Sequence, residues 1–217
     1  MPISVICVDD HPLMRKAIRL TVEESSLDLI IKGEGATELE AMDLIKRYLP
    51  DIALLDVSMR KGPTQTEPAD ICKIIHFVKS HSKNTKIIII SAIDQPSLIQ
   101  KILEGGANGY LLKIDNLSLN IPQAIQVTLL GGTFLSEGVP QLLINTTNDK
   151  FELTNQQQKI LQTIFDNPDK SLEQIAENLF MSINTLRVHL ARAREKLNAI
   201  NTTAAVVKAI RAGLIAI

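Results

Sequence analysis

The sequence has few aromatic residues, few cysteines and almost no net charge. Aromatic residues make up 3% of the 217 residues, and tryptophan is absent. The two cysteines, Cys7 and Cys72, are too few for a disulfide scaffold. Cys7 lies in an apolar run, which suits a reduced, buried thiol in a cytosolic protein. The 23 basic and 24 acidic residues give a net charge of -1, which by itself gives no sign of a nucleic-acid partner.

Long hydrophobic runs are also missing. The longest uncharged stretch, residues 116–136, is interrupted by Pro122 and by a pair of glycines, so we expect no membrane-spanning segment. Acidic residues near the start precede any apolar signal-peptide core, so we expect no secretory signal and a cytoplasmic protein. The hydrophobic content of 45% is ordinary for a globular protein, and the length suits one large or two small domains.

The first part of the chain alternates short apolar runs with longer helical patterns. Consecutive apolar positions, as in ISVICV and KIIIIS, are typical of strands covered on both faces, and hence of a parallel sheet. We predict strands at 4–8, 29–33, 52–55, 86–91 and 109–112, and helices at 12–24, 37–49, 69–82, 97–104 and 121–130. This order predicts an α/β domain with a doubly wound, five-stranded parallel sheet over residues 1–132.

The rest of the sequence is predicted to be all helical after a linker at residues 133–150. Thr154 with Gln157, and Ser171 with Gln174, form the pattern of a capping box at two helix starts. Two further helices are predicted at 184–197 and 202–212, the last closed by Gly213. Four helices with a tight turn between the second and third indicate a helix-turn-helix domain over residues 151–217.

Chemically suggestive side chains follow the predicted strands. Because ligands bind at the carboxyl ends of parallel strands, Asp9, Asp10, Asp56, Ser91 and Lys113 should converge on one crevice. Three carboxylates together call for a hard divalent cation such as Mg²⁺. Asp56 would then be a nucleophile toward phosphorus, and Lys113 and Ser91 would contact the phosphoryl oxygens. Singly, each of these residues is more often a turn former, a helix cap or a solvated charge; together at matching strand ends they form a much stronger signal.

The blocks VDDHPLMR, LLD, SAIDQ and GANGYLLK resemble the receiver domain of two-component response regulators, which has a flavodoxin-like fold. The resemblance implies that Asp56 is the phosphoacceptor and that Asp9, Asp10, Asp56 and the backbone carbonyl of Ser58 bind the metal. It further implies that Ser91 and Tyr110 act as a switch and that Lys113 binds the phosphate.

The loop after Asp56 departs from this pattern. The family usually has a proline four positions after its phosphoacceptor, whereas this sequence has Arg60 followed by several additional residues. Because the loop borders the phosphate site, the departure bears on the phosphorylation rate, on metal affinity and on the choice of kinase.

The C-terminal stretch resembles the LuxR-type helix-turn-helix of the NarL/FixJ subfamily, through SLEQIAENLFMSINTLRVHLARAREKL and its flanking segments. In the helix at 184–197, Leu186, Leu190, Ala193 and Leu197 should face the core, and Arg187, Ala191 and Arg194 the opposite side. Residues 151–217 hold eight basic against six acidic residues. By family position Arg187, Val188 and Ala191 would read bases, and the candidates for phosphate contacts are Arg192, Arg194, Lys196 and His189.

These observations predict a regulator, not an enzyme, that binds double-stranded DNA after phosphorylation of Asp56 by a histidine kinase or a small acyl phosphate. The active form is expected to be a homodimer. One alternative is a receiver-like DNA-binding regulator that acts without phosphorylation. A second is a Mg²⁺-dependent phosphatase with an aspartate nucleophile, but that chemistry usually needs an aspartate where Ser58 stands. A flavin-binding protein would need a glycine- and hydroxyl-rich loop where DDHPLM stands.

Overall fold

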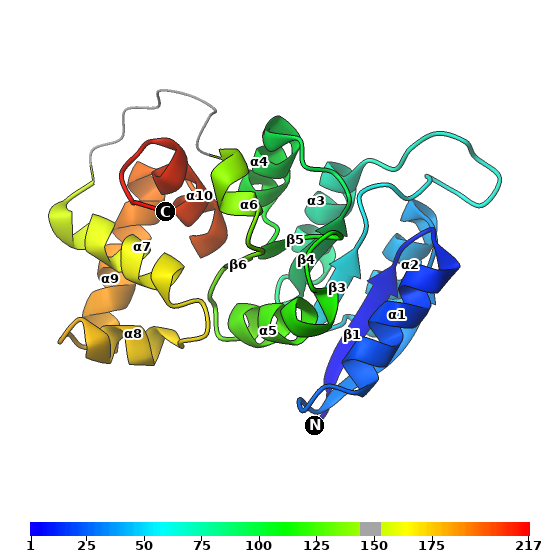
Figure 1. Cartoon of the computed structure of the whole chain (residues 1–217), viewed down its shortest axis with the longest axis horizontal. Helices are drawn as coiled ribbons and strands as arrows, with labels where there is room; N and C mark the ends of the chain where they lie inside the picture. Colours follow the sequence, from blue (N-terminus) through cyan, green and yellow to red (C-terminus); the bar gives the residue numbers. More distant parts are fainter. Residues whose placement is uncertain (144–152) are drawn as a thin grey trace.

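The structure, a computed structural model, describes residues 1–143 and 153–217 (Figure 1). Its sheet contains β1 (Ile3–Val8), β2 (Leu29–Gly35), β3 (Ile52–Leu55), β4 (Lys86–Ser91), β5 (Gly109–Leu112) and β6 (Phe134–Leu135). All neighbouring strands are parallel, in the order β2-β1-β3-β4-β5-β6. The predicted doubly wound parallel sheet is therefore confirmed, with one short strand more than the five expected.

Helices cover both faces of this sheet. They are α1 (Pro12–Glu23), α2 (Glu38–Tyr48), α3 (Ile71–His81), α4 (Pro96–Gly105), α5 (Leu117–Leu129) and the short α6 (Val139–Leu143). Alternate strand residues enter two cores: Val5 and Cys7 pack with α1 and α5, whereas Ile6 and Val8 pack with α2, α3 and α4. Burial on both faces explains why these strands are apolar at consecutive positions.

Helix α5 begins four residues before its predicted start. The side chain of Asn116 accepts a hydrogen bond from the Leu119 N–H and caps the first turn, so the helix continues through Pro122. The predicted start at residue 121 is therefore wrong by about one turn, and Pro122 lies inside the helix.

The C-terminal part consists of α7 (Asn155–Asp166), α8 (Leu172–Asn178), α9 (Ile183–Lys196) and α10 (Thr202–Arg211). Both predicted capping boxes are present, at Thr154 with Gln157 and at Ser171 with Gln174. Gly213 follows α10 with a φ of 65°, which a glycine adopts without steric cost. Of the predicted linker, residues 144–150 lie outside the described residues, and β6 and α6 lie in the remainder.

The two parts of the chain share one apolar core. Helix α10 packs against α4 and α6 (Figure 1). A single cluster of buried side chains extends from the sheet into the C-terminal helices. Among the residues that the structure describes, no helix has the length and hydropathy needed to cross a membrane.

Candidate functional site

Asp9, Asp56 and Lys113 meet at the carboxyl end of the sheet. Asp9 follows β1 and Asp56 follows β3; these strands are neighbours, and the Asp56 N–H donates to the Val8 carbonyl over 2.8 Å. Both aspartates are only 1% exposed. Nζ of Lys113, which follows β5, lies 2.8 Å from Oδ2 of Asp9 and 3.1 Å from Oδ2 of Asp56. The convergence expected from the strand ends is thus present in the structure.

Burial and the neighbouring charges shift the pKa values of Asp56 and Lys113 in opposite directions. Burial raises the pKa of Asp56, and the charge of Lys113 offsets part of that rise. Burial alone would lower the pKa of Lys113, but its contacts with Asp9 and Asp56 outweigh burial and raise that pKa. Lys113 therefore stays protonated and holds a permanent positive charge beside Asp56.

The residues around Asp56 fit a hard divalent cation. Single ligand atoms of Asp9, Asp10, His11 and Asp56 all lie within 4.8 Å of one another. Oδ1 of Asp56 is buried and has no hydrogen-bond partner, so a ligand is needed to satisfy it. Carboxylate oxygens are the donors that Mg²⁺ prefers. Ser58 is exposed at the same edge, two residues after Asp56.

Ser91 and Tyr110 meet at the main chain of Ile93. The Ile93 N–H donates to Oγ of Ser91 over 3.0 Å, and the Tyr110 hydroxyl donates to the Ile93 carbonyl over 2.8 Å. Tyr110 is fully buried, and burial raises its pKa to about 12, so its hydroxyl keeps its proton. The loop after β4 is thus bonded both to the strand that holds Ser91 and to the tyrosine on β5.

The extra residues after Asp56 form a small hairpin. Arg60 pairs in parallel with Thr37 and antiparallel with Pro68, and the Lys61 N–H donates to the Glu67 carbonyl. The carbonyls of Arg60 and Lys61 accept from the first two N–H groups of α2. Residues 63–68 at the tip are exposed. The insertion is therefore an ordered element that caps α2.

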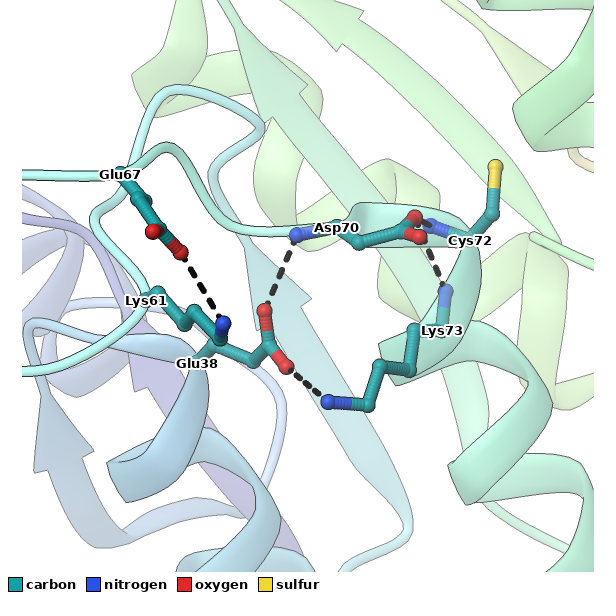
Figure 2. Close-up of polar contacts among 6 residues, drawn as sticks. All are labelled: Glu38, Lys61, Glu67, Asp70, Cys72 and Lys73. Carbon is teal, nitrogen blue, oxygen red and sulfur yellow. Dashed lines mark hydrogen bonds and ion pairs between the residues drawn. The ribbon is translucent and has the colours of Figure 1, made fainter.

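Glu38, at the start of α2, binds the start of α3, which follows this hairpin in the chain, as Figure 2 shows. Its carboxylate accepts from the Asp70 N–H over 3.0 Å and pairs with Nζ of Lys73 at 2.7 Å, although Glu38 is only 1% exposed. The Asp70 side chain in turn caps α3 by accepting from the N–H groups of Cys72 and Lys73. Nearer the tip, Lys61 and Glu67 form a more exposed pair at 3.0 Å.

Helix α9 buries its apolar side as predicted, but part of its charged side lies next to the N-terminal part of the chain. Leu186, Leu190, Ala193 and Leu197 are buried. The predicted reading residues are exposed or half-buried: Arg187, Val188, Ala191, Arg192 and Lys196 are exposed, and His189 and Arg194 are half-buried. Arg187 pairs with Glu173 at 3.2 Å. Arg187, Ala191 and Arg194 line a cavity shared with the N-terminal part of the chain, so one side of α9 is turned toward that part.

Polar contacts bind α10 to the N-terminal part. Asn201 donates to the Gly106 carbonyl over 3.1 Å, and Thr203 donates to the Asn108 carbonyl over 3.1 Å. At the other end of the helix, Arg211 pairs with Glu104 at 2.9 Å. The start and the end of α10 are therefore both attached to the α/β part.

Comparison with known proteins identifies both parts. Residues 5–119 match the response regulator receiver domain, and residues 152–209 match the luxR family of bacterial regulatory proteins. The chain belongs to the response regulators. It is 31% identical to the nitrate/nitrite response regulator protein NarP of Escherichia coli, over 95% of this chain and 94% of NarP. It belongs to a family of DNA-binding regulators and not of classical enzymes.

Solved structures of response regulators share the fold. The receiver domain of NarL from Mycobacterium tuberculosis is 32% identical, with a TM-score of 0.52 over 60% of this chain and 98% of that one. RcsB from Salmonella enterica serovar Typhimurium, solved bound to a promoter, has a TM-score of 0.59 at 22% identity, over 97% of this chain and 99% of that one. The second likeness concerns the fold alone.

Sequence reasoning missed several residues at the site of this response regulator. Arg15 donates to the Asp9 carbonyl over 2.6 Å, and Nδ1 of His11 lies 2.7 Å from Oδ1 of Asp10. The position of Arg15, about one turn after the helix start at Pro12, could have indicated that contact. The interdomain pair of Arg211 and Glu104 joins residues 107 positions apart, and no local pattern predicts it.

Proposed function

We propose that this response regulator is phosphorylated on Asp56 and that phosphorylation controls its binding to double-stranded DNA, and hence transcription. The observation that carries the proposal is the buried Asp56 carboxylate, which lies beside the protonated Lys113 and has an oxygen without a hydrogen-bond partner. An oxygen of Asp56 would attack the phosphorus of a histidine kinase's phosphohistidine or of a small acyl phosphate. The bond from phosphorus to the donor breaks, and the donor leaves.

Each residue of the pocket has a proposed role in that step. Asp9, Asp10, Asp56 and the carbonyl of Ser58 would hold Mg²⁺, which when bound offsets negative charge on the phosphoryl oxygens. Lys113 would form an ion pair with the new phosphoryl group, and the Ser91 hydroxyl would donate to it.

The structural change that follows phosphorylation would pass from Ser91 to the loop after β4. Ser91 Oγ now accepts from the Ile93 N–H, so a change of side-chain rotamer that carried Oγ toward a phosphoryl group would break that bond. Tyr110 holds the carbonyl of the same residue. A shift at Ile93 would move the start of α4, which packs on α10 and α6. Phosphorylation would thus shift the equilibrium between the observed arrangement and one in which α9 is free.

For DNA binding, α9 would enter the major groove. We propose that Arg187, Val188 and Ala191 contact bases and that Arg192, Arg194, Lys196 and His189 contact the backbone. Two copies of the chain would occupy two half-sites as a homodimer. A regulator of this kind works in the cytoplasm, where its DNA and its kinase's catalytic domain are found.

The decisive experiment is labelling with acetyl phosphate in the presence of Mg²⁺. Wild type should acquire one acid-labile phosphate, Asp56→Asn none, and Asp94→Asn, which changes an exposed carboxylate after β4, the wild-type amount. No labelling of the wild type would instead favour a regulator that acts without phosphorylation. The hairpin over residues 60–68, which stands where the family has a short loop after its phosphoacceptor, is the observation that favours that second function.

A further inference from the structure

A cavity of about 350 Å³ separates the receiver domain from the reading helix α9. Lys86, at the start of β4, contributes to its receiver wall, and Arg187 and Arg194 of α9 contribute to the opposite wall. The start of α10, at Thr202, closes one side. The volume is at the lower end of the range for sites that bind small molecules.

Every charged residue that lines this cavity is a cation. These residues are Lys86, Arg187 and Arg194, and no carboxylate lines the cavity. Glu173 pairs with Arg187, but both side chains are more than half exposed and the pair is screened by solvent. Lys86 forms no ion pair with any residue that the structure describes. Three basic residues from the two domains therefore line one space, and no acidic residue lines it with them.

One hydrogen-bond donor of Arg194 has no acceptor among the described residues. Its Nη2 donates to the Ile200 carbonyl over 2.5 Å, whereas its Nε is covered from solvent and has no partner within the described residues. A buried donor without a partner costs about 1–3 kcal/mol. A small shift of this side chain toward an acceptor in the cavity would remove that cost.

Two further features raise the positive potential here. Helix α10 is ten residues long and directs its N-terminal end at the cavity through Thr202. Behind the cavity wall, burial and then the charge of Lys86 lower the pKa of Lys79 to about 8. A negative charge in the cavity would stabilise both the partial positive charge at the N-terminal end of α10 and the protonated form of Lys79.

We propose that this cavity binds a compact anion that carries a diphosphate group, and that binding holds α9 against the receiver domain. A diphosphate matches the site because its several charges and acceptors can meet two guanidinium groups and one ammonium together. The inference rests on the proposed function, since Arg187 and Arg194 would serve both the anion and DNA. Binding of the anion and binding of DNA would therefore exclude each other.

Lys86 makes the proposal testable without altering a DNA contact. Binding of inorganic pyrophosphate to the full chain is measured by titration calorimetry in metal-free buffer at constant ionic strength. Wild type should bind one equivalent, and Lys86→Ala should bind at least tenfold more weakly. Lys83→Ala, which removes an exposed lysine three residues earlier, should behave as the wild type. Absence of binding, or equal binding by Lys86→Ala, overturns the proposal.

A second measurement separates this inference from the proposed function. Pyrophosphate should weaken DNA binding by the wild type several-fold, and sulfate at equal ionic strength should not. Lys86→Ala should bind DNA yet lose the pyrophosphate effect. An equal effect of pyrophosphate on both proteins would mean that the anion merely competes for DNA-contacting arginines, which contradicts the proposal. A chain that binds pyrophosphate through Lys86 but binds no DNA even after treatment with acetyl phosphate and Mg²⁺ would refute the proposed function alone.

Discussion

Arg211 of α10 and Glu104 of α4 form an ion pair across the domain boundary, with 2.9 Å between Nη1 and Oε1. The Arg211 side chain is 5% exposed and that of Glu104 26% exposed. The pair is therefore far less accessible to solvent than the pair of Arg187 and Glu173, and it lies where the two domains must part if α10 is to leave the receiver.

Removing the charge of Glu104 should favour separation of the domains. Because Arg211 would remain buried beside a neutral group, we expect Glu104→Gln to shift the equilibrium by about 1–2 kcal/mol, or roughly 5–30-fold. Hydrogen exchange of α10 amides in the unphosphorylated chain measures the shift. Asp43→Asn, which breaks an exposed pair with Arg47 on α2, is the matched control and should leave exchange unchanged. Equal exchange in wild type and Glu104→Gln would show that the pair does not hold the domains together.

Asp56 should make the metal-free protein less stable as pH rises. Its folded pKa is raised by burial above the unfolded value of 3.8. Protonation therefore favours the folded state, and that contribution is fully present below the unfolded pKa and lost as pH rises through the folded pKa. Asp56→Asn, which remains neutral, should raise Tm at pH 7 without metal.

Calorimetry measures how far Asp56→Asn raises Tm. A gain of about 1 kcal/mol corresponds to roughly 2–4 °C in a protein of this size. The difference between wild type and Asp56→Asn should shrink at pH 4 and on addition of MgCl2 at pH 7. A difference that does not depend on pH would contradict the assignment of the destabilisation to the charge of Asp56.

Glu38 should contribute much more to the hairpin than Glu67 does. Glu38→Ala leaves the Asp70 N–H and the Lys73 ammonium without their acceptor, at an expected cost of about 1–3 kcal/mol in urea unfolding. Glu67→Gln breaks the exposed pair with Lys61 and should cost less than about 1 kcal/mol. Faster hydrogen exchange in residues 60–68 should accompany only the first substitution. Similar costs for both would mean that the hairpin does not depend on its buried carboxylate.

Arg187 and Arg192 should differ in how their loss affects DNA binding. Arg187→Ala should cost about 1–3 kcal/mol at a specific site and little on random sequence, as expected for a base contact. Arg192→Ala should weaken binding to both DNAs by a similar factor and reduce the salt dependence, as expected for a phosphate contact. Equal losses on both DNAs for Arg187→Ala would reassign that residue to the backbone.

Sequence patterns predict the site well where a residue's position depends on local structure. Asp9, Asp56 and Lys113 follow strands whose apolar runs are unmistakable, so parallel pairing alone brings them to one edge. The first turns of α7 and α8 are likewise set by side chains three residues apart.

The parts that the sequence did not reveal depend on contacts between distant residues. The carbonyl of Arg60, which pairs with Pro68, accepts from the Glu38 N–H more than 20 residues earlier in the chain, and Arg211 meets Glu104 only because α10 packs on α4. Strand β6 has only two residues, too few for any periodicity to show.

That short strand affects how the receiver domain should be isolated. Leu135 pairs with Tyr110, and the Leu112 N–H donates to Oγ of Ser136, so β6 and the residue after it satisfy the open side of β5. A fragment that ends at residue 132 would leave β5 as an unprotected edge strand beside the site, ready to pair with another copy. We expect such a fragment to self-associate, and one that continues through α6 to Leu143 to remain monomeric in its unphosphorylated form.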